Sequence, residues 1–286
     1  MNSEPGIGNP SFARMKVTER LQFDICYGME SDTNSDPVAD QYRVGSLDHM
    51  RSLVDIALAT LQPGDRVLDL GAHLGGFALT AAAIGCQVMA VEASPRNAEL
   101  LRLSIAQNKF EKMAVIHAAV SDQNGSLEFS VLGPFGHIAT PKTGLPSISV
   151  PAVTIDDLLE QRQWDNVRFI KMDIEGAEVQ AMGGMQKLLR QSAAPIFFFE
   201  SNQHTLAFYE QTDKVLKSQY RRCGYTVYGI GRKKLLRVNE RTEQSATVKD
   251  YLAAKTLPPS LALWERSANS LFARVGRQLG LLKQIT

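Results

Sequence analysis

Residues 67–76, VLDLGAHLGG, join an apolar strand to a helix through a glycine-rich turn, and this pattern indicates the fold class. Glycines in such a turn let a ligand approach the backbone, and the turn presents backbone N–H groups at the start of the helix. Glu92 closes the next expected strand, 21 residues after Gly71. A carboxylate at that point can accept hydrogen bonds from both hydroxyls of a ribose. Together these features predict a site for a nucleoside-containing cofactor.

Strands and helices alternate along the chain beyond this turn. Apolar runs predict buried strands at 66–70, 87–92, 114–120, 167–172 and 196–200, and segments with helical spacing separate most of them. This alternation is typical of an α/β fold with a mostly parallel sheet and helices on both faces. A hairpin predicted from residues 225–230 and 235–238 would add an antiparallel edge strand.

We expect three parts in the chain. Residues 1–45 are rich in turn-forming residues and predict an irregular N-terminal arm, whereas residues 46–240 carry the α/β domain. Residues 241–286 predict a C-terminal helical extension or tail, in which 271–283 has the spacing of a basic amphipathic helix.

Composition narrows the class of protein and of partner. The 286 residues include 31 Lys and Arg against 30 Asp and Glu, so the basic excess of a nucleic-acid binder is absent and we expect no nucleic-acid partner. Cys26, Cys86 and Cys223 lie far apart, which argues against a disulfide framework or zinc cluster and favours a cytoplasmic location. The uncharged run 70–91 contains four glycines and predicts a strand, turn and helix rather than a transmembrane segment. Homo-oligomerisation is left open.

The turn also discriminates between cofactors. A dinucleotide site expects G-x-G-x-x-G, in which the middle glycine lets the backbone touch a pyrophosphate. His73 occupies that position here. S-adenosylmethionine has no phosphate, and its positively charged amino and sulfonium groups favour a carboxylate such as Asp69 near the turn. The sequence therefore favours S-adenosylmethionine, with a nicotinamide-dependent oxidoreductase as the alternative.

A second motif, FIKMDIEGAE at residues 169–178, places three carboxylates and a lysine where a strand ends and a helix begins. Ligands bind at the carboxyl ends of strands in open α/β sheets, so Asp173 is expected at the same edge as Asp69. We expect Lys171 to pair with a neighbouring carboxylate.

Four segments in order, 67–75, 91–95, 150–158 and 171–178, resemble the FkbM-type methyltransferases, and the resemblance extends over about residues 65–230. The family usually has Asn in place of His73. The resemblance implies a Rossmann-like class I methyltransferase fold with a seven-stranded sheet. It also implies methyl transfer from S-adenosylmethionine to a hydroxyl, often on a sugar or a polyketide-type natural product.

The resemblance also implies roles for individual residues. Those that would contact the cofactor are Asp69, Gly71 and Gly75 at its methionine end with His73 in the turn, Glu92 at the ribose, Ala93, Ser121 and Asp122 at the adenine, and Asp173 near the reacting methyl.

Methyl transfer to a hydroxyl calls for a general base within hydrogen-bond reach of the acceptor. Asp173 is the first candidate, followed by His204, Glu200 and Glu175, and we expect no metal. Candidates for substrate contact are His137 in the Gly- and Pro-rich loop, and Tyr42 and Arg43 in the N-terminal arm. An N-methyltransferase would need less base catalysis and stays as an alternative, as does a non-catalytic binding protein.

Overall fold

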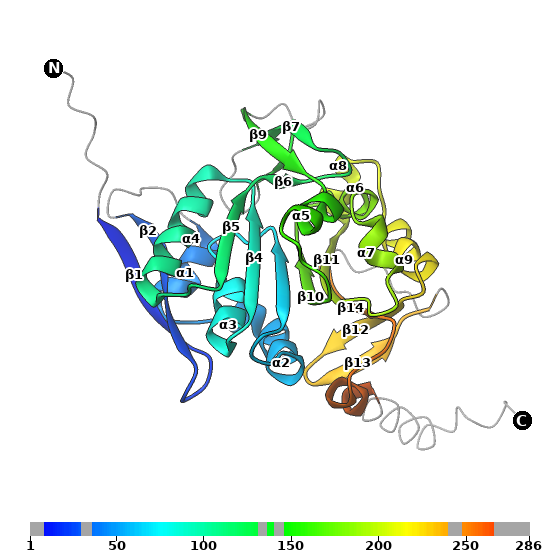
Figure 1. Ribbon diagram of the computed structural model, residues 1–286, viewed down its shortest axis with the longest axis horizontal. Helices are drawn as coiled ribbons and strands as arrows, with labels where there is room; N and C mark the ends of the chain where they lie inside the picture. Colours follow the sequence, from blue (N-terminus) through cyan, green and yellow to red (C-terminus); the bar gives the residue numbers. More distant parts are fainter. Residues whose placement is uncertain (1–8, 30–35, 131–135, 140–145, 240–247, 266–286) are drawn as a thin grey trace, which may run out of the picture.

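A sheet of eight strands lies at the centre of the computed structural model, which describes residues 9–29, 36–130, 136–139, 146–239 and 248–265 (Figure 1). Its order is β13-β12-β14-β11-β10-β3-β4-β5. The strands are β3 (Arg66–Leu70), β4 (Gln87–Glu92), β5 (Met113–His117), β10 (Val167–Met172), β11 (Ile196–Asn202), β12 (Thr226–Gly231), β13 (Lys234–Arg237) and β14 (Val248–Ala254).

The strands that follow the glycine turn and the second motif are neighbours. β5, β4, β3, β10 and β11 run parallel, and Asp69 of β3 is in register with Lys171 of β10. β12 and β13 form the expected hairpin, with β13 as an antiparallel edge strand. The predicted mostly parallel sheet is therefore confirmed, although it has one strand more than the seven expected.

The additional antiparallel strand is β14, which corrects our expectation for residues 241–286. β14 is not part of a tail but lies between β11 and β12, and it pairs with both. Residues 251–254 are buried, because a strand inside a sheet is covered on both faces. Their apolar run, Tyr-Leu-Ala-Ala, is too short to predict a strand. Residues 259–265 are helical, and the amphipathic segment 271–283 lies outside the described residues.

Helices cover both faces of the sheet through two apolar clusters. One face packs against α2 (Arg51–Thr60), α3 (Gly76–Ile84) and α4 (Pro95–Asn108). The other packs against α5 (Ile155–Gln161), α6 (Glu178–Gly183), α7 (Gln186–Arg190), α8 (Gln203–Phe208) and α9 (Asp213–Arg222). Because successive side chains of a strand point to opposite faces of the sheet, one strand contributes to both clusters: Phe198 faces the first, whereas Phe197 and Phe199 face the second.

The N-terminal arm is also more ordered than predicted. Residues 10–29 form an antiparallel hairpin of β1 (Pro10–Lys16) and β2 (Gln22–Met29), followed by α1 (Pro37–Arg43) and a 3-10 turn, η1 (Asp48–Met50). β2 lies against α4, where the backbone N–H of Cys26 donates to Ser104 Oγ at 2.8 Å. The alternation of Phe23 and Ile25, both buried, indicates this strand, and the expectation of an irregular arm was wrong for these residues.

A second sheet of four strands lies above the end of β5 in Figure 1. Its order is β6-β9-β7-β8, with β6 (Ala119–Val120), β7 (Gly125–Ser130), β8 (His137–Ile138) and β9 (Ser147–Val153). Across the part of the chain that the structure describes, no helix is long and apolar enough to cross a membrane.

The place of β14 inside the sheet predicts its contribution to stability. Leu252 is fully buried, so Leu252→Ala is expected to lower the free energy of unfolding by about 2–5 kcal/mol. Val248, on the same strand, is 50% exposed, and Val248→Ala is expected to cost less than about 0.5 kcal/mol. Denaturant titration of both variants measures the difference, and equal losses would contradict this placement.

Candidate active site

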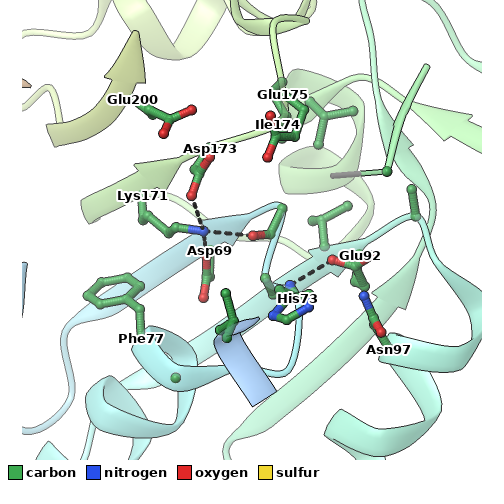
Figure 2. Close-up of a pocket in the computed structure, with 18 of the residues that line it drawn as sticks. Asp69, His73, Phe77, Glu92, Asn97, Lys171, Asp173, Ile174, Glu175 and Glu200 are labelled. Atoms are coloured by element: carbon green, nitrogen blue, oxygen red, sulfur yellow. Dashed lines mark hydrogen bonds and ion pairs between the residues drawn. The ribbon is translucent and has the colours of Figure 1, made fainter. Parts of the chain in front are cut away.

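A cavity of about 450 Å³ opens at the carboxyl ends of β3, β4, β10 and β11 (Figure 2). This is the edge at which open α/β sheets bind ligands, because the loops after neighbouring parallel strands diverge there. The glycine turn and Glu92 form one side of the cavity, and Asp173, Glu175 and Glu200 form another. The two motifs found in the sequence therefore meet at one site.

The glycine turn is held in place by the end of β4. Gly71 donates its backbone N–H to Val91 O at 2.9 Å, and His73 donates its own to Glu92 Oε2 at 2.7 Å. The other oxygen of Glu92 accepts from the N–H of Ser94 at 2.8 Å. A carboxylate has room for about four hydrogen bonds, so Glu92 is oriented by two and keeps acceptor capacity.

Position 71 requires a glycine. Its φ is +74°, and a Cβ there would lie 1.9 Å from the carbonyl oxygen of Asp173. The turn after β3 thus touches the backbone at the end of β10, which brings the two motifs into direct contact.

Lys171 connects the same two strand ends through its side chain, as expected. Its Nζ donates to Gly71 O at 2.7 Å and lies 3.4 Å from both Asp69 Oδ1 and Asp173 Oδ2. Burial disfavours its charge, but the two carboxylates outweigh this effect and raise the pKa of Lys171. Burial raises the pKa of Asp69 to about 6, and the charge of Lys171 offsets part of this effect. The ammonium stays charged and fixes both carboxylates.

Glu175 and Glu200 form an acidic wall beyond Asp173. Burial, reinforced by the charge of Asp173, raises the pKa of Glu175 to about 8 and that of Glu200 to about 9. Both carboxyls are therefore largely protonated at neutral pH and can donate a hydrogen bond. Glu175 Oε2 is one of the buried side-chain oxygens without a hydrogen-bond partner among the described residues.

The turn that carries Glu175 is shaped by Glu178. Glu178 is buried, and its Oε1 accepts from the backbone N–H groups of Ile174 and Gly176 at 3.1 and 3.3 Å. Glu175 itself has φ +54°, a conformation that non-glycine residues rarely adopt. Strain of this kind persists only where the surroundings impose it, and it is common at functional sites.

The structure brings together most of the predicted site residues. Those that line the cavity are Asp69, Gly71, His73, Glu92, Ala93, Asp173, Glu175 and Glu200.

Four of the predicted residues do not line the cavity. Gly75 is the N-cap of α3 and packs against Leu101 of α4. His204 is exposed on the first turn of α8. Ser121 and Asp122 both accept hydrogen bonds from Gln180 Nε2 of α6 at 3.1 Å, so they fasten this segment to α6 instead.

Several lining residues were missed in the sequence. Ala118, Ala119 and Val120, directly before Ser121, form an apolar part of the wall, and Asn97 comes from α4. Lys249 and Asp250 come from β14, and Val38, His49, Met50 and Leu53 come from segments before the glycine turn. No local pattern distinguishes these residues, because sheet order and helix packing place them. Of the three residues suggested for substrate contact, Tyr42 lines the cavity, whereas Arg43 and His137 do not.

These residues suit S-adenosylmethionine. Glu92 can accept from ribose hydroxyls, the apolar segment 118–120 offers a surface for a base, and Asp69 and Asp173 place carboxylates where a cationic end would lie. No cluster of three His, Cys, Asp or Glu side chains that could hold a metal ion occurs within the ranges that the structure describes.

Comparison with known proteins agrees with this chemistry. The sequence matches the methyltransferase FkbM domain over residues 69–227, more than half of the chain. No curated protein matches it.

Similar solved structures include a precorrin-6y methyltransferase from Geobacter metallireducens, which is 11% identical with a TM-score of 0.41, the match covering 72% of this chain and 87% of that one. A 16S rRNA methyltransferase of T. thermophilus is 17% identical with a TM-score of 0.45, and the match covers 89% and 52%. A S-adenosylmethionine-dependent methyltransferase from Aquifex aeolicus is 11% identical with a TM-score of 0.41, with coverage of 77% and 98%.

The family match extends from Asp69, at the end of β3, to Val227 in β12, and so includes both motifs of the cavity. It rules against the nicotinamide-dependent alternative. The chain belongs to the FkbM family of methyltransferases, has the Rossmann-like class I fold, and uses S-adenosylmethionine as its cofactor.

Proposed function

We propose that this enzyme is an O-methyltransferase that methylates a hydroxyl of a small molecule such as a sugar or a natural product. The observation that carries the proposal is the position of Asp173. Its side chain is 37% exposed, lines the cavity, and is held by the buried ammonium of Lys171. A carboxylate that is fixed but accessible is suited to remove a proton from an acceptor.

The residues on the cofactor side would orient the methyl donor. Glu92 would hold the ribose, the segment 118–120 with Ala93 would contact the adenine, and Asp69 would face the methionine end. When bound, S-adenosylmethionine supplies a methyl group on a sulfonium sulfur, which departs as a neutral thioether. The turn after β3 sets the donor's position because Gly71 and His73 are both bonded to the end of β4.

Asp173 would act as the general base. Its carboxylate accepts the hydroxyl proton while the hydroxyl oxygen forms its bond to the methyl carbon and the carbon–sulfur bond breaks. Lys171 keeps Asp173 in place through the contact at 3.4 Å, and in-line positioning of the two reactants supplies much of the rate. Glu200 and Glu175, protonated at neutral pH, would donate hydrogen bonds to other oxygens of the acceptor.

The charge of the wall bears on the acceptor class. Glu175, Glu200 and Asp250 line the cavity beside Asp173, and Lys249 lies next to Asp250 on β14. Glu175 and Glu200 are protonated at neutral pH, so the negative charge at this end of the cavity comes from the aspartates. Asp69, Asp173 and Asp250 carry this charge, and the two lysines in the lining, Lys171 and Lys249, balance it only in part. An anionic acceptor would meet repulsion from these aspartates. We therefore propose an acceptor that is neutral or positively charged rather than phosphorylated or acidic.

Replacement of the proposed base tests the reaction type. Asp173→Asn is expected to lower methyl transfer about 10²–10⁴-fold, because the amide cannot accept the proton, while the affinity for S-adenosylhomocysteine changes less than about threefold. Asp122→Asn, outside the cavity, is the matched control. Turnover is measured on a panel of hydroxylated sugars and polyketides, and product NMR locates the methyl group. Unchanged turnover of Asp173→Asn, or a methyl group on nitrogen, would contradict the proposal.

The raised pKa of Glu200 predicts how stability depends on pH. The carboxyl has a pKa of 4.5 when unfolded and about 9 when folded, so the folded state holds a proton that the unfolded state releases between these values. Its stabilisation is complete below pH 4.5 and is lost as the pH rises through 9, with a slope of up to about 1.4 kcal/mol per pH unit.

Glu200→Gln removes this ionisation. Its free energy of unfolding is expected to fall less steeply between pH 6 and pH 9 than that of the wild type, since other buried carboxyls still contribute. Glu160→Gln, whose glutamate side chain is 73% exposed, is the control and should leave the slope unchanged. Parallel pH curves for the wild type and Glu200→Gln would show that Glu200 is not protonated in the folded state.

A further inference from the structure

Helix α1 precedes the segment that matches the family, yet it contacts the cofactor turn at two points. The first contact joins Asp36, directly before the helix, to His73 in the glycine turn. The second joins Tyr42, near the end of the helix, to Gly76 at the start of α3. Val38 and Tyr42 of this helix also line the cavity. A short N-terminal helix is thus part of the site.

The two carboxylate oxygens of Asp36 contact different elements, one the helix and the other the turn. Its Oδ1 accepts from the backbone N–H groups of Val38 and Ala39 at 2.9 and 3.1 Å, which caps α1. Its Oδ2 lies 3.1 Å from His73 Nε2, and the two side chains are only 15% and 19% exposed. Burial alone would raise the pKa of Asp36, but His73 and the backbone donors outweigh it and lower the pKa. The carboxylate therefore stays ionised beside His73.

The hydroxyl group of Tyr42 makes the second contact. The side chain is buried, and a Cβ added to Gly76 would lie 2.2 Å from the Tyr42 hydroxyl oxygen. The hydroxyl thus occupies space that any larger residue at position 76 would need. The helix therefore packs directly against the first residue of α3, immediately after the turn.

His73 links α1 to the carboxylate that faces the ribose site. Its side chain contacts Asp36, while its backbone N–H donates to Glu92 Oε2 at 2.7 Å. Its φ is +53°, so the backbone adopts a left-handed conformation that costs energy for a residue with a Cβ. The contact with Asp36 helps to impose that conformation.

We propose that α1 clamps the cofactor turn, and that Asp36 is a positioning residue for S-adenosylmethionine. Asp36 fixes the ring of His73, His73 holds its backbone N–H on Glu92, and Glu92 is thereby aimed at the ribose. This role of Asp36 rests on the cofactor site but not on a particular acceptor. It can therefore be disproved while O-methyl transfer stands, and O-methyl transfer can be disproved while this role stands.

Asp36→Asn tests the clamp without removing the helix cap, because Asn is as good an N-cap as Asp. The variant is expected to bind S-adenosylhomocysteine about tenfold more weakly by calorimetry, since a charge-assisted hydrogen bond is lost. Asp40→Asn is the matched control: Asp40 lies on the same helix, is 47% exposed, and pairs with Arg43 away from the turn. An affinity of Asp36→Asn equal to that of Asp40→Asn would overturn the proposal.

Two further measurements separate positioning from a general structural role. In a His73→Asn background, Asp36→Asn is expected to cost less than about twofold, because the contact is already lost. The 2′-deoxy analogue of S-adenosylhomocysteine should lose less affinity in Asp36→Asn than S-adenosylhomocysteine itself, since it keeps only one of the two ribose hydroxyls from which Glu92 can accept. Equal losses for both ligands, or additive losses in the double variant, would show that Asp36 does not act through His73 and Glu92.

Discussion

The buried ammonium of Lys171 holds the ends of β3 and β10 together. It lies 3.4 Å from Asp69 and from Asp173, and it donates to the carbonyl of Gly71. Without it, two carboxylates would face each other in a largely buried site, which is strongly unfavourable. This one cation fixes the proposed base, the carboxylate at the methionine end and the glycine turn in a single arrangement.

The rest of the cavity is built onto this centre from three directions. β4 contributes Glu92, which is oriented by the backbone of the turn. β14, inserted between β11 and β12, adds Asp250 to the acidic wall. Helix α1 contributes Val38 and Tyr42 to the lining. Two of these three elements lie outside the segment 69–227 that defines the family, so features specific to this chain are expected there.

The sequence predicted the parts of this arrangement that follow from local pattern. The turn at 67–76 and the strand that ends at Met172 were recognisable, and parallel strands necessarily bring their carboxyl ends to one edge. Ser121 was misplaced because the chain after β5 enters a second sheet, which turns Ser121 towards Gln180 and leaves 118–120 at the cavity. His204 follows β11 in sequence, but α8 carries it to the surface. The place of Asp250 at the cavity could not be predicted from the sequence, since it depends on the insertion of β14 into the sheet rather than on any neighbouring residue.

The most direct measurement is a calorimetric titration with S-adenosylhomocysteine of the wild type, of Glu92→Gln, and of the exposed control Glu99→Gln on α4. Glu92 is where the turn, β4 and the ribose site meet, so Glu92→Gln is expected to weaken binding at least about tenfold while Glu99→Gln binds like the wild type. Equal affinities of Glu92→Gln and the wild type, in protein with an unchanged thermal transition, would contradict the placement of the cofactor at this turn.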